Sequence, residues 1–160
     1  MPVTPYHFGP GLLIKALAPR HVSFTAFVVA NVVIDLESVV NLIAGRSPVH
    51  ATLHTLVGAL IVGTLSGWAT AVIAKRLGST RPSLAMQPAL VGGVLGGLGQ
   101  TVLDAIMHRD LLPLLPFSAA NPILRVLDLG VLHAACMVTG LVGTVVLLVR
   151  KLAKPPSRTP

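Results

Sequence analysis

Four long apolar stretches constrain the fold of this chain more than any other feature of its sequence. They cover residues 22–44, 55–74, 83–103 and 129–149. A helix needs about 20 residues to cross a hydrocarbon core of about 30 Å, and each stretch reaches that length. None of them alternates apolar and polar residues as a strand of a membrane barrel does. We therefore expect four transmembrane helices.

The amino-acid composition supports this interpretation. Hydrophobic residues make up 53% of the 160 residues and charged residues 11%, and the mean hydropathy is +0.82. A soluble domain of this size needs more charge to cover its surface. We predict an all-α, polytopic integral membrane helix bundle in which residues 1–153 form one domain. Residues 154–160 are basic and rich in proline, which predicts a disordered tail.

The positive charges predict how the helices are oriented. Of the twelve lysines and arginines, nine lie before the first stretch, between the second and third, or after the fourth. Because positively charged segments tend to remain in the cytoplasm, we expect the C-terminus there and the loop at 108–127 on the outer side. The same rule accounts for the net charge of +7, so this charge does not indicate a nucleic-acid partner.

Ionisable residues inside a membrane are costly, and their positions therefore point to function. Antiparallel spans bring the ends of the first and third stretches to the same side as the starts of the second and fourth. Seven ionisable residues lie at these ends and starts: Asp35, Glu37, His50, His54, Asp104, His108 and His133. We expect all seven at one level, near the outer face of the membrane.

An early histidine could join this group. Residues 8–19 are apolar but too few to cross a membrane, and we expect them to form a half-depth helix antiparallel to the first span. If the chain turns near residue 19, His7 and Asp35 both lie about 20 Å from that turn, at about 1.5 Å per residue. His7 would then reach the level of Asp35.

The spacing of these residues suggests a metal site. His50 and His54 are four residues apart, as are Asp104 and His108, so each pair would project from one face of a helix. Such pairs present ligands to one or two divalent metal ions, and imidazole with carboxylate suits Zn, with Mn or Fe as alternatives. The candidate ligands are His7, Asp35, His50, His54, Asp104 and His108.

The sequence leaves several of these roles open. Asp35 and Glu37 are about 200° apart around a helix, so either the helix is distorted or Asp35 alone faces the site while Glu37 supports a partner. His50 could be a loop residue above the site. The alternative to a metal is a network of ion pairs, but three histidines and two aspartates have too few buried cations to pair with.

Other polar residues are expected to have ordinary structural roles. A single histidine in a span is more often a packing residue than a ligand, which is our interpretation of His133. Asp110 and Asp128 are expected to be solvated loop acids paired with Arg109 and Arg125.

Glycines one turn apart predict close helix packing. Residues 92–97 contain two overlapping GxxxG spacings, and residues 63–67 contain another. Small residues at this spacing let helix backbones approach closely in lipid. The same faces could also join copies of the chain into an oligomer.

The candidate residues lie in segments that resemble the YbcI/YdjM-type inner-membrane proteins. The resemblance rests on an early Tyr-His-Phe-Gly (6–9), the acidic pair at 35–37 and the His-rich segment at 50–55. It extends to the Asp-containing helix end at 103–108 and the Leu-Leu-Pro-Phe-Ser segment at 114–118.

This chain departs from that family at two places. The family usually has Pro-Asp-x-Asp where residues 34–37 are Ile-Asp-Leu-Glu. It commonly has Arg-Gly between the two histidines, where residues 51–52 are Ala-Thr. The set of metal ligands could differ accordingly.

The resemblance implies a membrane-bound, metal-dependent hydrolase of the bacterial inner (cytoplasmic) membrane. The residues themselves suggest metal-activated water that attacks an ester or phosphoester, with Glu37 or Asp35 as the catalytic carboxylate. A site near the lipid–water boundary suits a lipid or lipid-linked substrate. The alternatives are a metal-ion or proton transporter, a metal-handling membrane protein, and a structural membrane protein without enzymatic activity.

Overall fold

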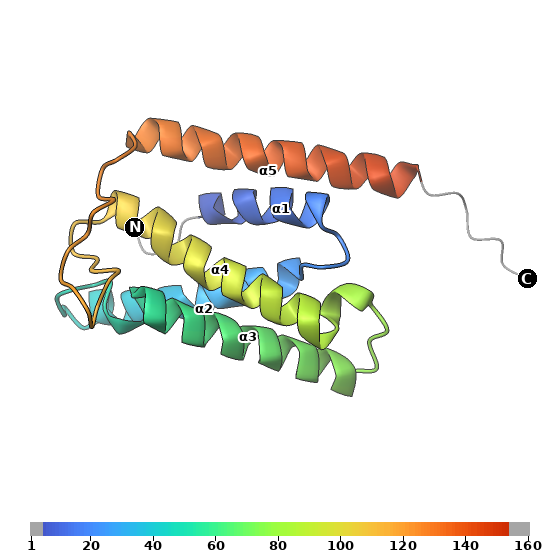
Figure 1. Cartoon of the computed structure of the whole chain (residues 1–160), viewed down its shortest axis with the longest axis horizontal. Coiled ribbons are helices and arrows are strands. Elements are labelled where there is room, and N and C mark those ends of the chain that lie inside the picture. Colours follow the sequence, from blue (N-terminus) through green and yellow to red (C-terminus); the bar gives the residue numbers. More distant parts are fainter. Residues whose placement is uncertain (1–4, 154–160) are drawn as a thin grey trace, which may run out of the picture.

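The computed structural model describes residues 5–153, and every regular element within this range is a helix (Figure 1). The predicted tail at residues 154–160 lies outside the described part. In chain order the elements are the 3-10 helix Pro5–His7, α1 (Phe8–Leu17), α2 (Phe24–Ile43), the 3-10 helix Thr52–His54, α3 (Leu56–Arg76), the 3-10 helix Pro82–Leu84, α4 (Met86–Met107) and α5 (Leu129–Leu152).

Helices α2, α3, α4 and α5 are long and apolar enough to cross a membrane, which confirms the predicted helical membrane bundle. They run roughly along the long axis of the molecule (Figure 1). Large apolar side chains remain exposed on their outer faces, among them Leu65, Trp68 and Leu141. In a soluble protein such faces would be unfavourable, whereas lipid can cover them.

The boundaries of α4 differ most from the prediction, which placed this span at 83–103. Pro82 begins a separate 3-10 helix, so α4 itself begins only at Met86. At the other end the apolar stretch stops before Asp104, but that residue is buried against protein and the helix continues to Met107. The charge of Asp104 ends the apolar stretch from which the span was predicted, but the helix itself continues past it.

Side-chain oxygens cap the starts of three long helices. Ser23 Oγ accepts a hydrogen bond from the amide of Ala26 at 3.3 Å, and Thr55 Oγ1 accepts one from Gly58 at 2.9 Å. Asp128 accepts two amide hydrogen bonds at the start of α5. These side chains satisfy amides that have no partner within the helix, and so they define where each helix begins.

Glycines allow α4 to pack directly against the backbones of two neighbouring helices. A Cβ added at Gly93 would lie 2.1 Å from the carbonyl oxygen of Gly63 in α3. A Cβ at Gly96 would lie 2.4 Å from the carbonyl oxygen of Phe27 in α2. The predicted helix packing is confirmed. These glycine faces are used for contacts within one chain, and oligomer formation stays a prediction.

Helix α1 is a short helix that lies beside α5 (Figure 1). Small residues admit this contact: a Cβ at Gly9 would lie 1.9 Å from the carbonyl oxygen of Cys136, and a Cβ at Gly143 would lie 2.6 Å from the carbonyl carbon of Leu12. The short N-terminal helix was predicted correctly. It contacts the first span as expected, with Gly11 against the ring of Phe27 in α2, but it packs mainly on α5, which was not predicted.

Candidate metal centre

The polar residues predicted to share one depth meet at the end of the bundle that lies on the left of Figure 1. Helices α2 and α4 end there, and α3 and α5 begin there. The buried polar side chains that form this centre are His7, Asp35, His50, His54, Gln100 and Asp104. Buried polar groups require partners, and their contacts therefore define the site.

Asp35, His54 and Asp104 form the first cluster, which we call the inner triad. His54 Nε2 lies 3.7 Å from Asp35 Oδ1 and 3.5 Å from Asp104 Oδ2. One potential ligand atom from each residue lies within 4.8 Å of the other two, and all three residues are buried. The residues come from α2, the 3-10 helix Thr52–His54 and α4, so only the tertiary structure brings them together.

The second carboxylate oxygen of Asp104 faces two further histidines. Its Oδ1 lies 3.7 Å from His7 Nε2 and 3.8 Å from His108 Nε2. The predicted position of His7 at this level is thus found in the structure. Asp104 therefore stands between two groups of imidazoles, with one oxygen directed to each.

Gln100 connects the carboxylates to His7. Its Nε2 donates to Asp35 Oδ1 at 2.6 Å and to Asp104 Oδ2 at 3.0 Å. Because carboxylates only accept, these two bonds orient the amide, and Gln100 Oε1 must be the atom 2.6 Å from His7 Nδ1. His7 Nδ1 consequently donates, which in the neutral ring leaves Nε2 with a lone pair facing Asp104.

Glu37 lies behind His54. Its two oxygens accept hydrogen bonds from the backbone amides of Thr52 at 3.1 Å and Leu53 at 2.8 Å. Glu37 Oε2 is also 3.7 Å from His54 Nδ1. Because α2 continues as one helix past both acids, Asp35 faces the site and Glu37 supports the segment that carries His54. This geometry matches the second of the two arrangements that the sequence left open.

A second cluster lies beside the first and is formed by His50, His108 and Asp110, which we call the outer triad. Asp110 Oδ2 accepts hydrogen bonds from the amides of Val49 at 3.0 Å and His50 at 3.2 Å, and it lies 3.0 Å from His50 Nδ1. The rings of His50 and His108 stack with centroids 4.0 Å apart. Asp110 is a partly exposed loop acid, but the expectation that it pairs with arginine is wrong, because its partner is His50.

Of the two pairs expected on single helix faces, the structure forms one. Asp104 and His108 contact each other across the last turn of α4: the His108 amide donates to Asp104 O at 2.8 Å, and His108 Nε2 lies 3.8 Å from Asp104 Oδ1. His54 belongs to a 3-10 helix and His50 to the loop before it, so this pair does not share a helix, although the two rings meet edge to face at 4.9 Å.

The two clusters bind protons differently. Burial disfavours the charged form of His54, but Asp104 and Asp35 outweigh this effect and raise the pKa of His54 to about 9. Burial, together with the neighbouring His50, lowers the pKa of His108 to about 4. Burial alone would raise the pKa of Asp110, but hydrogen bonds from the His50 amide and ring hold it below its usual range.

The spacing of the inner groups fits a metal ion better than hydrogen bonds. Direct N–H···O bonds measure about 2.7–3.2 Å, whereas the four contacts of Asp35 and Asp104 with His7, His54 and His108 measure 3.5–3.8 Å. Two tetrahedral ligands at about 2.1 Å from one ion are about 3.4 Å apart. His54 presents Nε2 to both carboxylates, while its Nδ1 faces Glu37. The donor set therefore suits a divalent ion.

Two other predicted polar residues, His133 and Asp128, lie outside the two triads. The ring of His133 stacks on Tyr6 with centroids 4.8 Å apart, so it packs as expected. Asp128 caps α5. Among the described residues, no ion pair joins the loop acids to Arg109 or Arg125.

The segment after α4 packs across this end of the bundle. The side-chain amide of Asn121 donates to the carbonyl oxygens of Ala105 at 2.8 Å and Leu111 at 3.2 Å. The amide of Leu56, the first residue of α3, donates to Pro113 O at 2.8 Å. The segment thus ties the start of α3 to the end of α4 and holds Asp110 beside His50.

Comparisons with known proteins add no family to this description. No family model matches the chain, and no curated protein or solved structure is significantly similar to it. The resemblance to the YbcI/YdjM-type proteins therefore stays a prediction.

Two residues of the centre were missed from the sequence. Gln100 lies one helical turn before Asp104, and an amide at that position in an apolar span was an available signal. Asp110 follows α4 in a loop, and its contact with His50 depends on how residues 108–113 turn back toward α3. No local pattern indicated that turn.

Proposed function

We propose that this protein is a membrane-embedded, metal-dependent hydrolase. The observation that carries the proposal is the placement of Asp104, whose two oxygens face separate sets of imidazoles at 3.5–3.8 Å. These separations are too long for strong hydrogen bonds and suit ligands that share an ion. Such a site is costly to maintain at the edge of a membrane, which argues for a functional role.

The donor geometry supports an ion in the inner triad, where Asp35, His54 and Asp104 would hold it. His7 and His108 lie beside the other oxygen of Asp104, but they do not form a three-ligand group with it. Gln100 fits this assignment because it orients both carboxylates and leaves the Nε2 lone pair of His7 directed at the site. Zn suits the mixture of imidazole and carboxylate, with Mn and Fe as alternatives.

When bound, divalent ions would make water nucleophilic near neutral pH and polarise the scissile ester or phosphoester. The protein's own groups then have to orient this chemistry and move a proton. Glu37 uses both oxygens to hold the backbone of the His54 segment, so we assign it a positioning role. His50 is the better proton acceptor, because Asp110 fixes its ring through Nδ1.

The position of the centre favours a lipid or lipid-linked substrate. Asp110 is partly exposed, so the outer triad provides an approach to the buried inner triad. Apolar side chains of the adjoining segment remain exposed, with Phe117 at 87% and Val126 at 65%. Exposed apolar groups beside a polar site suit the boundary between lipid and water.

A transporter is the second candidate, but the distribution of charge does not favour it. A pathway needs ionisable or polar groups along its length. In the described part of the chain, no ionisable side chain of α2, α3 or α4 lies between this centre and Lys75 in the last turn of α3.

Metal analysis and hydrolysis assays test the proposal together. The purified full-length protein is expected to retain divalent metal in detergent, measured by elemental analysis. Asp104→Asn should abolish retention, whereas Asp128→Asn, the same change in a helix cap at the same end, should not. The wild type should hydrolyse generic phosphodiester or ester substrates in a metal-dependent way.

The outcomes separate the candidate functions. A wild-type protein that binds no divalent metal under saturating conditions would contradict both the hydrolase and the metal transporter. Metal retention with flux through vesicles, but without hydrolysis of any ester or phosphoester class, would favour the transporter.

A further inference from the structure

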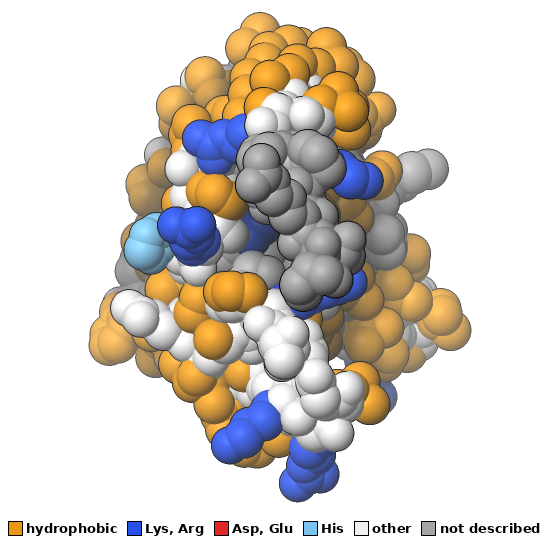
Figure 2. Space-filling model, turned by 90° about the vertical axis from the view of Figure 1, so that its right-hand side faces the viewer, with side chains coloured by type: hydrophobic (Ala, Val, Ile, Leu, Met, Phe, Trp, Pro, Cys, Tyr) orange, Lys and Arg blue, Asp and Glu red, His pale blue; other side chains and the backbone are white. Residues whose placement is uncertain are grey.

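The end of the molecule opposite the metal centre carries cations without acidic partners. The chain has five acidic residues in total. Four belong to the metal-centre end and the fifth, Asp128, caps the start of α5 at that same end. Figure 2 views the opposite end and shows Lys and Arg side chains on its described surface, with no acidic side chain among them.

A hollow at this end gathers several of these cations. Its volume is about 790 Å³, and it lies between the turn after α1, the 3-10 helix Pro82–Leu84 and the end of α5. Its polar lining residues are Arg20, His21, Ser83, Arg150 and Lys151.

Hydrogen bonds hold two neighbouring cations and shape the hollow. Lys15 Nζ donates to the carbonyl oxygens of Pro19 and Val22, the latter at 2.8 Å. Arg150 donates to the carbonyl oxygen of Ala16 at the end of α1. These bonds satisfy carbonyl groups at a helix end. They fix the turn that carries Arg20 but supply no negative charge.

Arg20 and Lys151 remain available to a ligand. Both are exposed, and neither forms a hydrogen bond or ion pair within the described range. Apolar side chains share the lining, including Leu17, which is 68% exposed, and Leu147. The hollow therefore combines cations with an apolar wall at the end of membrane-spanning helices.

We propose that this hollow binds the headgroup of an anionic phospholipid. The phosphate would lie among Arg20, Arg150 and Lys151, and the start of the acyl chains would lie along Leu17 and Leu147. Basic pockets between helices at a membrane surface bind such headgroups by this combination of charge and apolar contact. The apolar wall is what favours a lipid over free phosphate.

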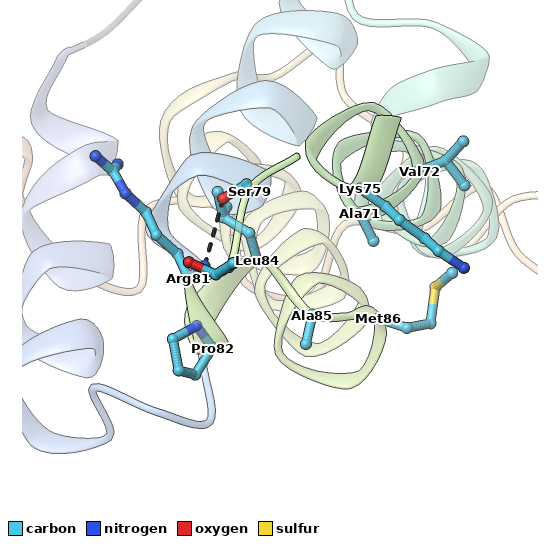
Figure 3. Close-up of a pocket in the computed structure, with 10 residues that line it drawn as sticks. Ala71, Val72, Lys75, Ser79, Arg81, Pro82, Leu84, Ala85 and Met86 are labelled. Carbon is cyan, nitrogen blue, oxygen red and sulfur yellow. Dashed lines mark hydrogen bonds between the residues drawn. The ribbon is translucent and has the colours of Figure 1, made fainter. Parts of the chain in front are cut away.

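The neighbouring pocket in Figure 3 does not offer the same arrangement. It is lined by residues of the α3–α4 connection, including Lys75 and Arg81. In Figure 3 the side chains of these two residues point toward opposite sides of the view, and a hydrogen bond from the Arg81 amide to Ser79 holds the connection. This pocket therefore provides a comparison at the same end of the molecule.

Lipid binding to the full-length protein in detergent tests the proposal. The probes are fluorescent phosphatidylglycerol and phosphatidylcholine with matched acyl chains. We expect a preference for the anionic lipid of about tenfold, lost in the double variant Arg20→Gln/Lys151→Gln. The control Lys75→Gln/Arg76→Gln removes the same charge at the same end, outside the hollow, and should retain the preference.

Three results would overturn the proposal. Equal binding of the two lipids by the wild type would show that the hollow does not select for negative charge. An equal loss of the lipid preference in both double variants would show a non-specific effect of surface charge. Displacement of the lipid by millimolar inorganic phosphate would show a free-phosphate site instead. Trp68 fluorescence and gel filtration check folding, and Lys151→Gln alone provides a milder variant of the same test.

Discussion

The two ends of this bundle treat charge in opposite ways. At the metal-centre end, buried carboxylates and imidazoles contact one another, and Gln100 satisfies the carboxylates. At the opposite end, cations such as Arg20 and Lys151 lie on the surface without acidic partners. Charge at the membrane boundary can be solvated, whereas charge within the bundle must be paired or bind an ion. The difference shows why the candidate metal ligands lie at the first end and not at the second.

The largest expected effect concerns the helix packing that supports both ends. Gly93→Ala places a Cβ 2.1 Å from a backbone oxygen of α3. Backbone cannot move aside as a flexible side chain can, so we expect a loss of about 3 kcal/mol in the free energy of unfolding. Gly99→Ala, where a Cβ meets nothing within 4 Å, is the control, measured by denaturation in detergent. Equal stabilities would contradict the packing described for α4.

The next effect isolates the metal-centre end. Gln100→Leu keeps the size of the side chain but removes the donor to Asp35 and Asp104. Loss of a group that orients metal ligands typically lowers metal affinity about 10- to 100-fold. Gln87→Leu changes an exposed residue of the same helix and should leave affinity unchanged. Titration calorimetry with Zn²⁺ measures the affinity of both variants. Equal affinities would contradict the role of Gln100 in orienting the metal ligands.

The third prediction uses pH. The raised pKa of His54, about 9, means that the metal-free centre holds a proton that an ion must displace. Below that pKa, metal affinity should therefore increase about tenfold for each unit by which the pH rises. The stability of the metal-free protein should instead decrease as the pH rises. The contribution of His54 is present below its unfolded pKa of about 6.5 and is lost as pH rises through about 9.

The control for this pH dependence is His133→Gln, which removes a histidine that packs on Tyr6 outside both triads. Its metal affinity should show the same slope with pH as the wild type. A wild-type affinity that is constant between pH 6 and 8 would show that no proton is displaced, and it would contradict the role of His54.

The smallest effect is expected at the cationic end. Lys75→Gln/Arg76→Gln removes two exposed charges that form no ion pair with a described acid. Exposed substitutions of this kind change stability by about 0.5 kcal/mol or less, and metal affinity should not change. A large loss of metal from this variant would show that the two ends are coupled and would contradict their separate treatment of charge.

Much of the fold could be predicted because lipid imposes one simple requirement. A segment that crosses it must be a helix of about 20 apolar residues, and such segments are visible in the chain. The depth of the site could be predicted for the same reason, since antiparallel spans place Asp35, His54 and Asp104 at one level. His7 followed from counting residues along the short first helix.

Tertiary structure alone decided how the centre is assembled. Asp110 meets His50 because the segment after α4 packs over the start of α3, and α1 lies against α5 because small residues there admit its backbone. Hydropathy records how each residue responds to lipid and water, but it carries no information about which neighbours it meets. Solvent preference set the number and depth of the helices, whereas close packing between distant segments determined which donors face Asp104.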